Sequence, residues 1–107
     1  METMLATSPE QLAEFKNNGV AHQLIDIREL YEVETCCIGG LHIPMGEIVA
    51  RIEEIRRDVP VIVHCKSGRR SEAVVAHLHK MGFNNITSLE GGIMGWIDTI
   101  DPSLERY

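Results

Sequence analysis

The 107-residue sequence predicts a single α/β domain over residues 1–107, with a mainly parallel central sheet flanked by helices on both faces. Short apolar runs alternate with amphipathic runs along the chain, which is typical of strands that alternate with helices. The run Pro60-Val61-Ile62-Val63 lacks any polar alternation, so it indicates a strand buried on both faces. In open sheets of this kind a ligand binds beyond the carboxyl ends of the strands.

The first half of the chain predicts one helix and two short strands. Ser8 can cap the helix, Pro9 suits its first position and Gln11 completes a capping box. We expect the helix to stop at residues 17–19, where Gly19 can take a left-handed conformation. Apolar, β-branched runs and a terminating proline then define the following elements: a strand over 24–27, a short helical turn over 29–34 and a strand over 41–44.

The second half predicts three helices and two strands. Apolar residues recur with helical spacing at Ile48, Val49, Ile52 and Ile55, which predicts a helix over 47–57. The remaining elements follow the same logic: a strand over 60–63, a helix over 71–81 that ends at Gly82, a strand over 86–89, a turn over 90–92 and a helix over 93–100.

Charge and cysteine count narrow the possible partners. Lys and Arg total 10 and Asp and Glu total 16, and the resulting net charge of −6 makes nucleic acid an unfavourable partner. No apolar run approaches the roughly 20 residues that span a bilayer, so we expect no membrane partner. The first six residues show no secretory signal, and the three cysteines are an odd number. We therefore expect a cytoplasmic protein with free thiols. Neither a metal nor an organic cofactor is implied.

The clearest chemical feature is a cysteine directly after a predicted buried strand. The loop from Cys65 to Arg70 precedes a helix, so its backbone N–H groups and the positive end of that helix can face the sulfur. Gly68 supplies the conformational freedom that a tight loop needs. Three cations add formal charge: Lys66, Arg69 and Arg70. Each of these features lowers a thiol pKa and favours the nucleophilic thiolate. A buried structural cysteine is the alternative, but it explains neither the glycine nor the cations.

Other polar residues have two interpretations each. His64 is either a general base or, as we favour, a strand residue whose ring forms a local hydrogen bond. The adjacent Cys36 and Cys37 are more simply two small loop residues than resolving thiols, because neighbouring cysteines bond only with strain. His77 and His79 are two residues apart and thus face different sides of a helix, which argues against a metal site. Two further residues are equally a surface ion pair or a brace for the cysteine loop: Asp26 and Arg28.

A resemblance to a known family rests on the run His64-Cys65-Lys66-Ser67-Gly68-Arg69-Arg70-Ser71, which is similar to the active-site loop of the rhodanese-like domain. Further similar segments occur in the family's order: Asp26-Ile27-Arg28-Glu29, Tyr31-Glu32, Gly39-Gly40, His42-Ile43-Pro44 and Leu89-Glu90-Gly91-Gly92-Ile93 with Trp96. The short form of the stretch 38–44 and the segments 96–98 and 101–104 resemble the rhodanese domain fused to adenylyltransferases of ubiquitin-like sulfur carriers.

The resemblance implies a role for each matching position. Cys65 would carry a persulfide, and Asp26 and Arg28 would brace its loop. Arg69 and Arg70 would bind an anionic donor, or would close the loop by pairing with an acid. The residues implied to cradle the persulfide or bind substrate are Lys66, Ser67, Gly68, Arg69, Arg70 and Ser71.

The sequence therefore favours a sulfurtransferase that uses covalent catalysis at Cys65. The donor would be thiosulfate or a persulfide, and the acceptor would be a thiol, cyanide or a sulfur carrier. A persulfide carrier without turnover, or a docking module, needs the same cysteine and is the alternative. A cysteine phosphatase or arsenate reductase is disfavoured, because Ser71 stands where the phosphatase signature has its arginine. A thioredoxin-like reductase lacks its Cys-x-x-Cys pair.

Overall fold

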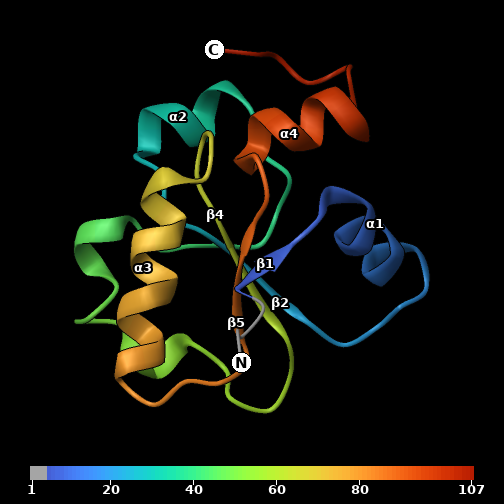
Figure 1. The fold of residues 1–107 in the computed structure, drawn as a ribbon. Helices are drawn as coiled ribbons and strands as arrows, with labels where there is room; N and C mark the ends of the chain where they lie inside the picture. Colours follow the sequence, from blue (N-terminus) through green and yellow to red (C-terminus); the bar gives the residue numbers. More distant parts are fainter. Residues whose placement is uncertain (1–4) are drawn as a thin grey trace.

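The computed structural model describes residues 5–107, which form a parallel five-stranded sheet in the order β1-β5-β4-β2-β3 (Figure 1). Residues 1–4, on which the expectation about a secretory signal partly rests, lie outside this range. The strands are β1 (Ala6–Thr7), β2 (Gln23–Asp26), β3 (Leu41–His42), β4 (Val61–His64) and β5 (Ile86–Leu89). The predicted α/β class with a parallel sheet is confirmed.

Helices cover both faces of the sheet (Figure 1). They are α1 (Pro9–Asn17), α2 (Leu30–Thr35), α3 (Arg69–Lys80) and α4 (Gly92–Thr99). Alternate residues of each strand point to opposite faces, so Leu24 and Ile62 pack with α1 and α4, whereas Ile25 and Val63 belong to the core beneath α3. No helix within residues 5–107 has the length and apolar character needed to cross a membrane.

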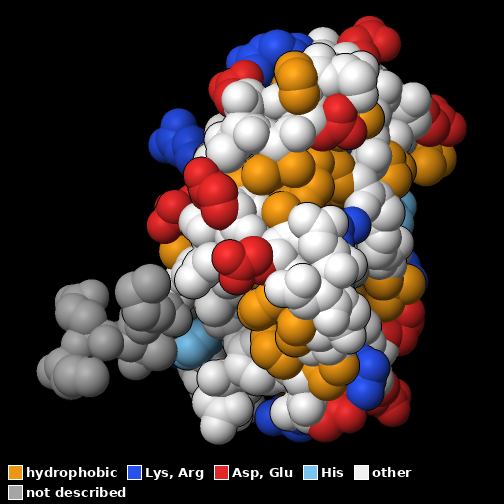
Figure 2. Space-filling model, turned by 90° about the vertical axis from the view of Figure 1, so that its right-hand side faces the viewer, with side chains coloured by type: hydrophobic (Ala, Val, Ile, Leu, Met, Phe, Trp, Pro, Cys, Tyr) orange, Lys and Arg blue, Asp and Glu red, His pale blue; other side chains and the backbone are white. Residues whose placement is uncertain are grey.

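The core on the side of α1 and α4 extends toward the surface. Its fully or largely buried members include Leu12, Ile62 and Trp96. Partly buried hydrophobic residues pack around them: Ala13, Phe15, Ile38, Ile100 and Leu104. Figure 2 shows apolar side chains exposed between acidic ones on this side of the molecule.

The predicted start and stop of the first helix are confirmed at atomic level. The Ser8 hydroxyl accepts a hydrogen bond from the Gln11 N–H at 3.1 Å, and the Gln11 side chain accepts one from the Ser8 N–H at 3.0 Å. At the other end Gly19 has φ +64°, and the Val20 N–H donates to the Phe15 carbonyl at 3.0 Å. The hydrogen bonds at the two ends of α1 thus satisfy backbone groups that a helix end leaves unpaired.

The predicted helix over 47–57 is wrong as a continuous α-helix. The segment instead forms two 3₁₀ turns, Met45–Glu47 and Ile52–Glu54. The helical spacing still identified two core residues, because Ile48 and Ile55 are buried. It did not hold for Val49, which is 59% exposed. β-branched side chains lower helix propensity, so burial of the isoleucines rather than backbone preference shapes this segment.

The strand β1 was not predicted. Its two residues are too few to show any periodicity, and its place follows from pairing at the edge of the sheet. The backbone fixes it there, because the Ser88 N–H donates to the Leu5 carbonyl at 2.8 Å and the Glu90 N–H donates to the Thr7 carbonyl at 2.9 Å.

We predict that Leu12→Ala lowers the free energy of unfolding by about 3 kcal/mol, because a fully buried leucine leaves a cavity when truncated. Urea unfolding followed by circular dichroism measures the change. Val49→Ala serves as the matched control, since Val49 is mostly exposed and its truncation should cost less than about 0.5 kcal/mol. Equal losses in the two variants would contradict the assignment of Leu12 to the core.

Candidate active site

The candidate site lies at the carboxyl end of β4, the central strand of the sheet. β4 pairs with β2 on one side and with β5 on the other, so loops and helices that follow all three strands meet at one edge. The chain leaves β4 at His64 and enters α3 at Arg69. Gly68 lies between them with φ +111°, a left-handed conformation that favours glycine. The intervening loop therefore curls tightly at the start of α3.

The Cys65 thiol lies inside this loop with 1% of the residue exposed. The Gly68 N–H donates a hydrogen bond to the Cys65 Sγ at 3.2 Å, and the Sγ lies 3.6 Å from the Ser71 Oγ. Burial raises the pKa of the thiol, but the side-chain hydrogen bond between Cys65 and Ser71 and hydrogen bonds from the backbone of Ser71, Gly68 and Arg70 outweigh it and lower the pKa below its ordinary value. The loop thus favours a thiolate.

A chain of hydroxyl groups connects the thiol to the neighbouring strand. The Ser71 Oγ lies 2.7 Å from the Ser88 Oγ of β5 and 3.2 Å from the Gly68 carbonyl. Both serines are buried. Sequence reasoning missed Ser88, although a serine within a short buried apolar strand is a signal that could have identified it.

The three cations of the loop have different surroundings. Arg70 donates two hydrogen bonds to the buried Glu32 carboxylate of α2, at 2.8 and 2.9 Å. Lys66 is half-buried, and its ammonium lies 4.7 Å from the centre of the Tyr107 ring. Arg69 is exposed, as is the neighbouring Ser67. Among the described residues, Arg70 is therefore the loop cation that forms an ion pair.

Asp26 and Arg28 form a buried ion pair, and the surface interpretation is wrong. Their side chains are 2% and 0% exposed, with Nη2 to Oδ2 at 2.7 Å and Nε to Oδ1 at 2.9 Å. Arg28 also donates to the carbonyls of Glu32 and Cys36, at 3.3 and 2.8 Å, and to the Tyr107 hydroxyl at 3.1 Å. The pair therefore holds α2, whose Glu32 in turn reaches the cysteine loop.

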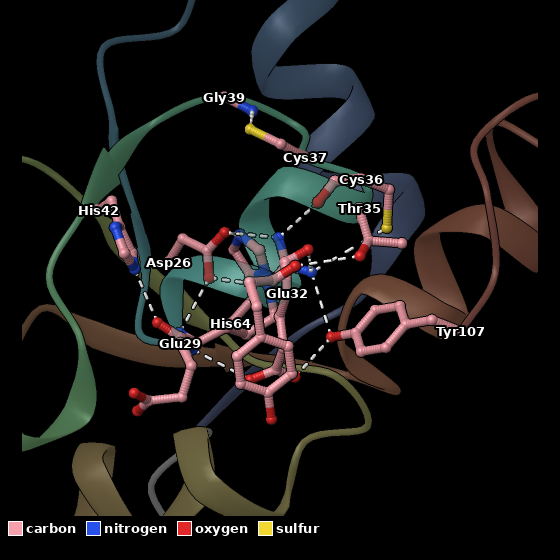
Figure 3. Close-up of polar contacts among 12 residues, drawn as sticks. Asp26, Glu29, Glu32, Thr35, Cys36, Cys37, Gly39, His42, His64 and Tyr107 are labelled. Atoms are coloured by element: carbon pink, nitrogen blue, oxygen red, sulfur yellow. Dashed lines mark hydrogen bonds and ion pairs between the residues drawn. The ribbon is translucent and has the colours of Figure 1, made fainter.

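Glu32 and Tyr107 belong to the site, although sequence reasoning assigned neither a role. The Tyr107 hydroxyl donates to the Glu32 carboxylate at 2.7 Å (Figure 3). The Arg70 hydrogen bonds are the main cause that lowers the pKa of Glu32 to about 2, although burial opposes them. Burial raises the pKa of Tyr107 to about 12, so its hydroxyl keeps the proton it donates. A tyrosine 75 positions away from Glu32 leaves no spacing signal.

His64 lies fully buried between the ion pair and the cysteine. Its Nε2 is 3.7 Å from the Asp26 Oδ2, and neither ring nitrogen has a hydrogen-bond partner within the described part of the chain. The predicted local hydrogen bond is therefore not formed in standard geometry. Burial lowers the pKa of His64 to about 4, although interaction with the Cys65 backbone acts to raise it, so the imidazole is neutral near pH 7.

Cys36 and His42 lie close to Arg28 of the ion pair, whereas Cys37 lies at the surface. Cys36 is buried at the end of α2, with its Sγ 4.0 Å from an Arg28 nitrogen, whereas Cys37 is exposed and accepts a hydrogen bond from the Gly39 N–H. The His42 Nε2 lies 2.7 Å from the Arg28 carbonyl. Among residues 5–107 no group of three or more His, Cys, Asp or Glu side chains is arranged to hold a metal ion.

The start of α4 is hydrogen-bonded to the backbone of the cysteine loop. The Ile93 N–H donates to the Cys65 carbonyl at 2.9 Å, and the Met94 N–H donates to the Lys66 carbonyl at 3.0 Å. This contact requires glycine at position 92, where φ is +60° and a Cβ atom would lie 2.4 Å from the Lys66 carbonyl oxygen. N–H groups of α4 thus fix the carbonyl groups at the start of the loop, while N–H groups later in the loop face the sulfur.

The parallel sheet and the strand–loop–helix that directs backbone N–H groups at one thiol define a class of α/β domains with a cysteine loop whose geometry suits an anion. The family model for the rhodanese-like domain matches residues 8–99, and the chain belongs to this family. The predicted family is confirmed.

Similar proteins include whole sulfurtransferases and parts of larger enzymes. A sulfurtransferase of Allochromatium vinosum is 38% identical over 74 residues, which are 68% of this chain and 69% of that protein. The probable adenylyltransferase/sulfurtransferase MoeZ of Mycobacterium tuberculosis is 29% identical over 106 residues, which cover 94% of this chain but only 26% of MoeZ. The crystal structure of a rhodanese-related protein from Thermoplasma volcanium has a TM-score of 0.77 and 32% identity, with 87% of this chain and 90% of that chain covered.

The buried neutral His64 predicts a specific loss of stability in acid. Its pKa is about 4 in the fold and 6.5 ordinarily, so between these values the unfolded chain binds more protons and the free energy of unfolding falls as the pH falls. Between pH 7 and pH 4 this loss should be about 3 kcal/mol. We expect His64→Phe to lose about that much less than the wild type over the same range, measured by urea unfolding. Parallel pH profiles would show that His64 does not titrate differently in the fold.

Proposed function

We propose that this protein is a rhodanese-type sulfurtransferase that passes a sulfane sulfur through a persulfide on Cys65. The observation that carries the proposal is the hydrogen bond from the Gly68 N–H to the Cys65 Sγ, at 3.2 Å, in a loop that lowers the thiol pKa. Membership of the rhodanese-like family and the sulfurtransferases among its relatives agree with it.

In the first step the Cys65 thiolate attacks the outer sulfur of the donor. From thiosulfate, the bond between the two sulfur atoms breaks and sulfite leaves with the electron pair. From an alkyl persulfide, the corresponding bond breaks and the alkyl thiolate leaves. In both cases Cys65 gains one sulfur atom and becomes a persulfide, and no external oxidant or reductant is consumed.

In the second step an acceptor nucleophile attacks the terminal sulfur of the Cys65 persulfide. A thiol, cyanide or a sulfur carrier takes that sulfur, and the Cys65 thiolate leaves with the electrons of the broken bond. The loop would stabilise the anion in both steps through fixed dipoles that need little reorganisation. The residues that we propose to line this cradle or its entrance are Lys66, Ser67, Gly68, Arg69, Arg70 and Ser71. Asp26 and Arg28 would act at a distance, through α2.

The phosphatase alternative remains disfavoured by the contents of the loop. Ser71 follows Cys65 by six residues, and its hydroxyl lies 3.6 Å from the Cys65 Sγ. A phosphatase loop places an arginine at that point to hold the phosphate oxygens. The loop of this chain therefore fits a sulfur atom bonded to cysteine better than a tetrahedral oxyanion.

We predict that the wild-type protein gains the mass of one sulfur atom when it is incubated with thiosulfate or a persulfide donor, and that Cys65→Ser does not. Intact-protein mass spectrometry measures the gain. Cys36→Ser and Cys37→Ser are the matched controls, because each removes a thiol outside the cradle and should leave the gain unchanged. Retention of the added sulfur by Cys65→Ser would contradict the proposed mechanism.

Turnover distinguishes an enzyme from a carrier. Addition of cyanide should remove the added sulfur and release thiocyanate over many cycles. A Cys65 persulfide that forms but is passed on only once, to a protein acceptor, would favour the persulfide-carrier alternative.

A further inference from the structure

The cysteine loop presents less free positive charge than its sequence indicates. Three cations follow Cys65, but the Arg70 guanidinium is already bound to both oxygens of the Glu32 carboxylate. Arg70 and Glu32 therefore form a neutral pair at the edge of the site. The charge left for a donor comes from Lys66 and from the exposed Arg69.

Glu32 is fixed in place and cannot easily release Arg70. Its carboxylate accepts a hydrogen bond from the Glu29 N–H at 3.0 Å and another from the Tyr107 hydroxyl at 2.7 Å (Figure 3). The Tyr107 hydroxyl in turn accepts from Arg28, which is buried and paired with Asp26. Glu32 is 4% exposed, so bulk water does not compete for its oxygens. These contacts hold the Glu32 carboxylate in place beside Arg70.

Arg70 is close enough to the thiol for its charge to matter. It lies in the first turn of α3, next to Ser71, and its own backbone N–H helps to lower the Cys65 pKa. The Cys65 thiolate in return interacts with the Arg70 guanidinium electrostatically. A free guanidinium at this place would attract a donor that carries two negative charges, because Arg binds oxyanions strongly and with two parallel hydrogen bonds.

We propose that Glu32 is a specificity-determining residue, which neutralises Arg70 and thereby selects a persulfide donor over thiosulfate. Thiosulfate carries two negative charges, and both must enter a site in which the Arg70 guanidinium is already bound to Glu32. The reacting group of an alkyl persulfide carries at most one negative charge and needs no second cation. The proposal rests on the proposed function, because it concerns the donor that gives its outer sulfur to Cys65 and leaves as a thiolate.

The test compares two donors on the wild type and on Glu32→Gln, which keeps the size of the side chain and removes its charge. The donors are thiosulfate and the persulfide of 2-mercaptoethanol, whose charge lies only on sulfur. The wild type should use the persulfide more efficiently, in kcat/KM. In Glu32→Gln the ratio of thiosulfate to persulfide kcat/KM should rise about tenfold, as one freed charge-assisted hydrogen bond allows. The rise should come mainly through a lower KM for thiosulfate.

Two matched variants show whether the effect passes through Arg70. Glu34→Gln removes an exposed carboxylate of the same helix that is not paired with Arg70, and it should leave the donor ratio unchanged. In an Arg70→Gln background, Glu32→Gln should no longer raise thiosulfate use, since there is no guanidinium to release. The gain in the single variant should also shrink as ionic strength rises, because salt screens the freed charge.

The outcomes separate this proposal from the proposed function. If Cys65 takes sulfur from the persulfide but the donor ratio stays the same in Glu32→Gln, or changes equally in Glu34→Gln, the role of Glu32 is wrong and sulfur transfer stands. A wild type that prefers thiosulfate also overturns the proposal, and this measurement needs no variant. If the wild type takes sulfur from neither donor, both proposals fail.

Discussion

The buried ion pair between Asp26 and Arg28 is the interaction on which the rest of the site depends. Two charges removed from water are costly unless each is fully hydrogen-bonded, and a broken pair leaves one charge uncompensated. Arg28 meets this requirement by using its remaining donors on α2 and on Tyr107. One buried guanidinium therefore joins the end of β2, the helix that follows it and the C-terminal segment. The Glu32 carboxylate, and through it Arg70, takes its position from this junction.

The thiolate form of Cys65 is stabilised chiefly by hydrogen bonds from neutral groups. Backbone N–H groups and the Ser71 hydroxyl lower the pKa of Cys65, while Arg70 is occupied by Glu32. Fixed dipoles inside a buried loop are screened by salt much less than charges on a surface. In the proposed mechanism the site separates two tasks: the backbone would hold the sulfur anion, and the side chains around the entrance would select the donor that approaches it.

Much of this arrangement could be predicted because it depends on local sequence. The capping box at Ser8, the buried strand before Cys65 and the glycine in its loop all act within a few residues. The two 3₁₀ turns over 45–54 could not be distinguished from a helix, because both structures bury Ile48 and Ile55. The roles of Glu32 and Tyr107 depend on contacts between residues that lie far apart in the chain. The unpartnered ring of His64 likewise follows from packing, which a strand pattern does not encode.

The edges of the sheet have a consequence for assembly. The two outer strands, β1 and β3, are only two residues long each in the described part of the chain. Long exposed edges act as templates on which another polypeptide can add a strand, and short ones offer few free backbone groups for that purpose. The outer strands of this sheet are thus poor sites for recognition by strand addition, the mode that many peptide-binding domains use. A macromolecule that exchanges sulfur with this domain would instead meet the loops above the carboxyl ends of the strands, with side chains deciding the match.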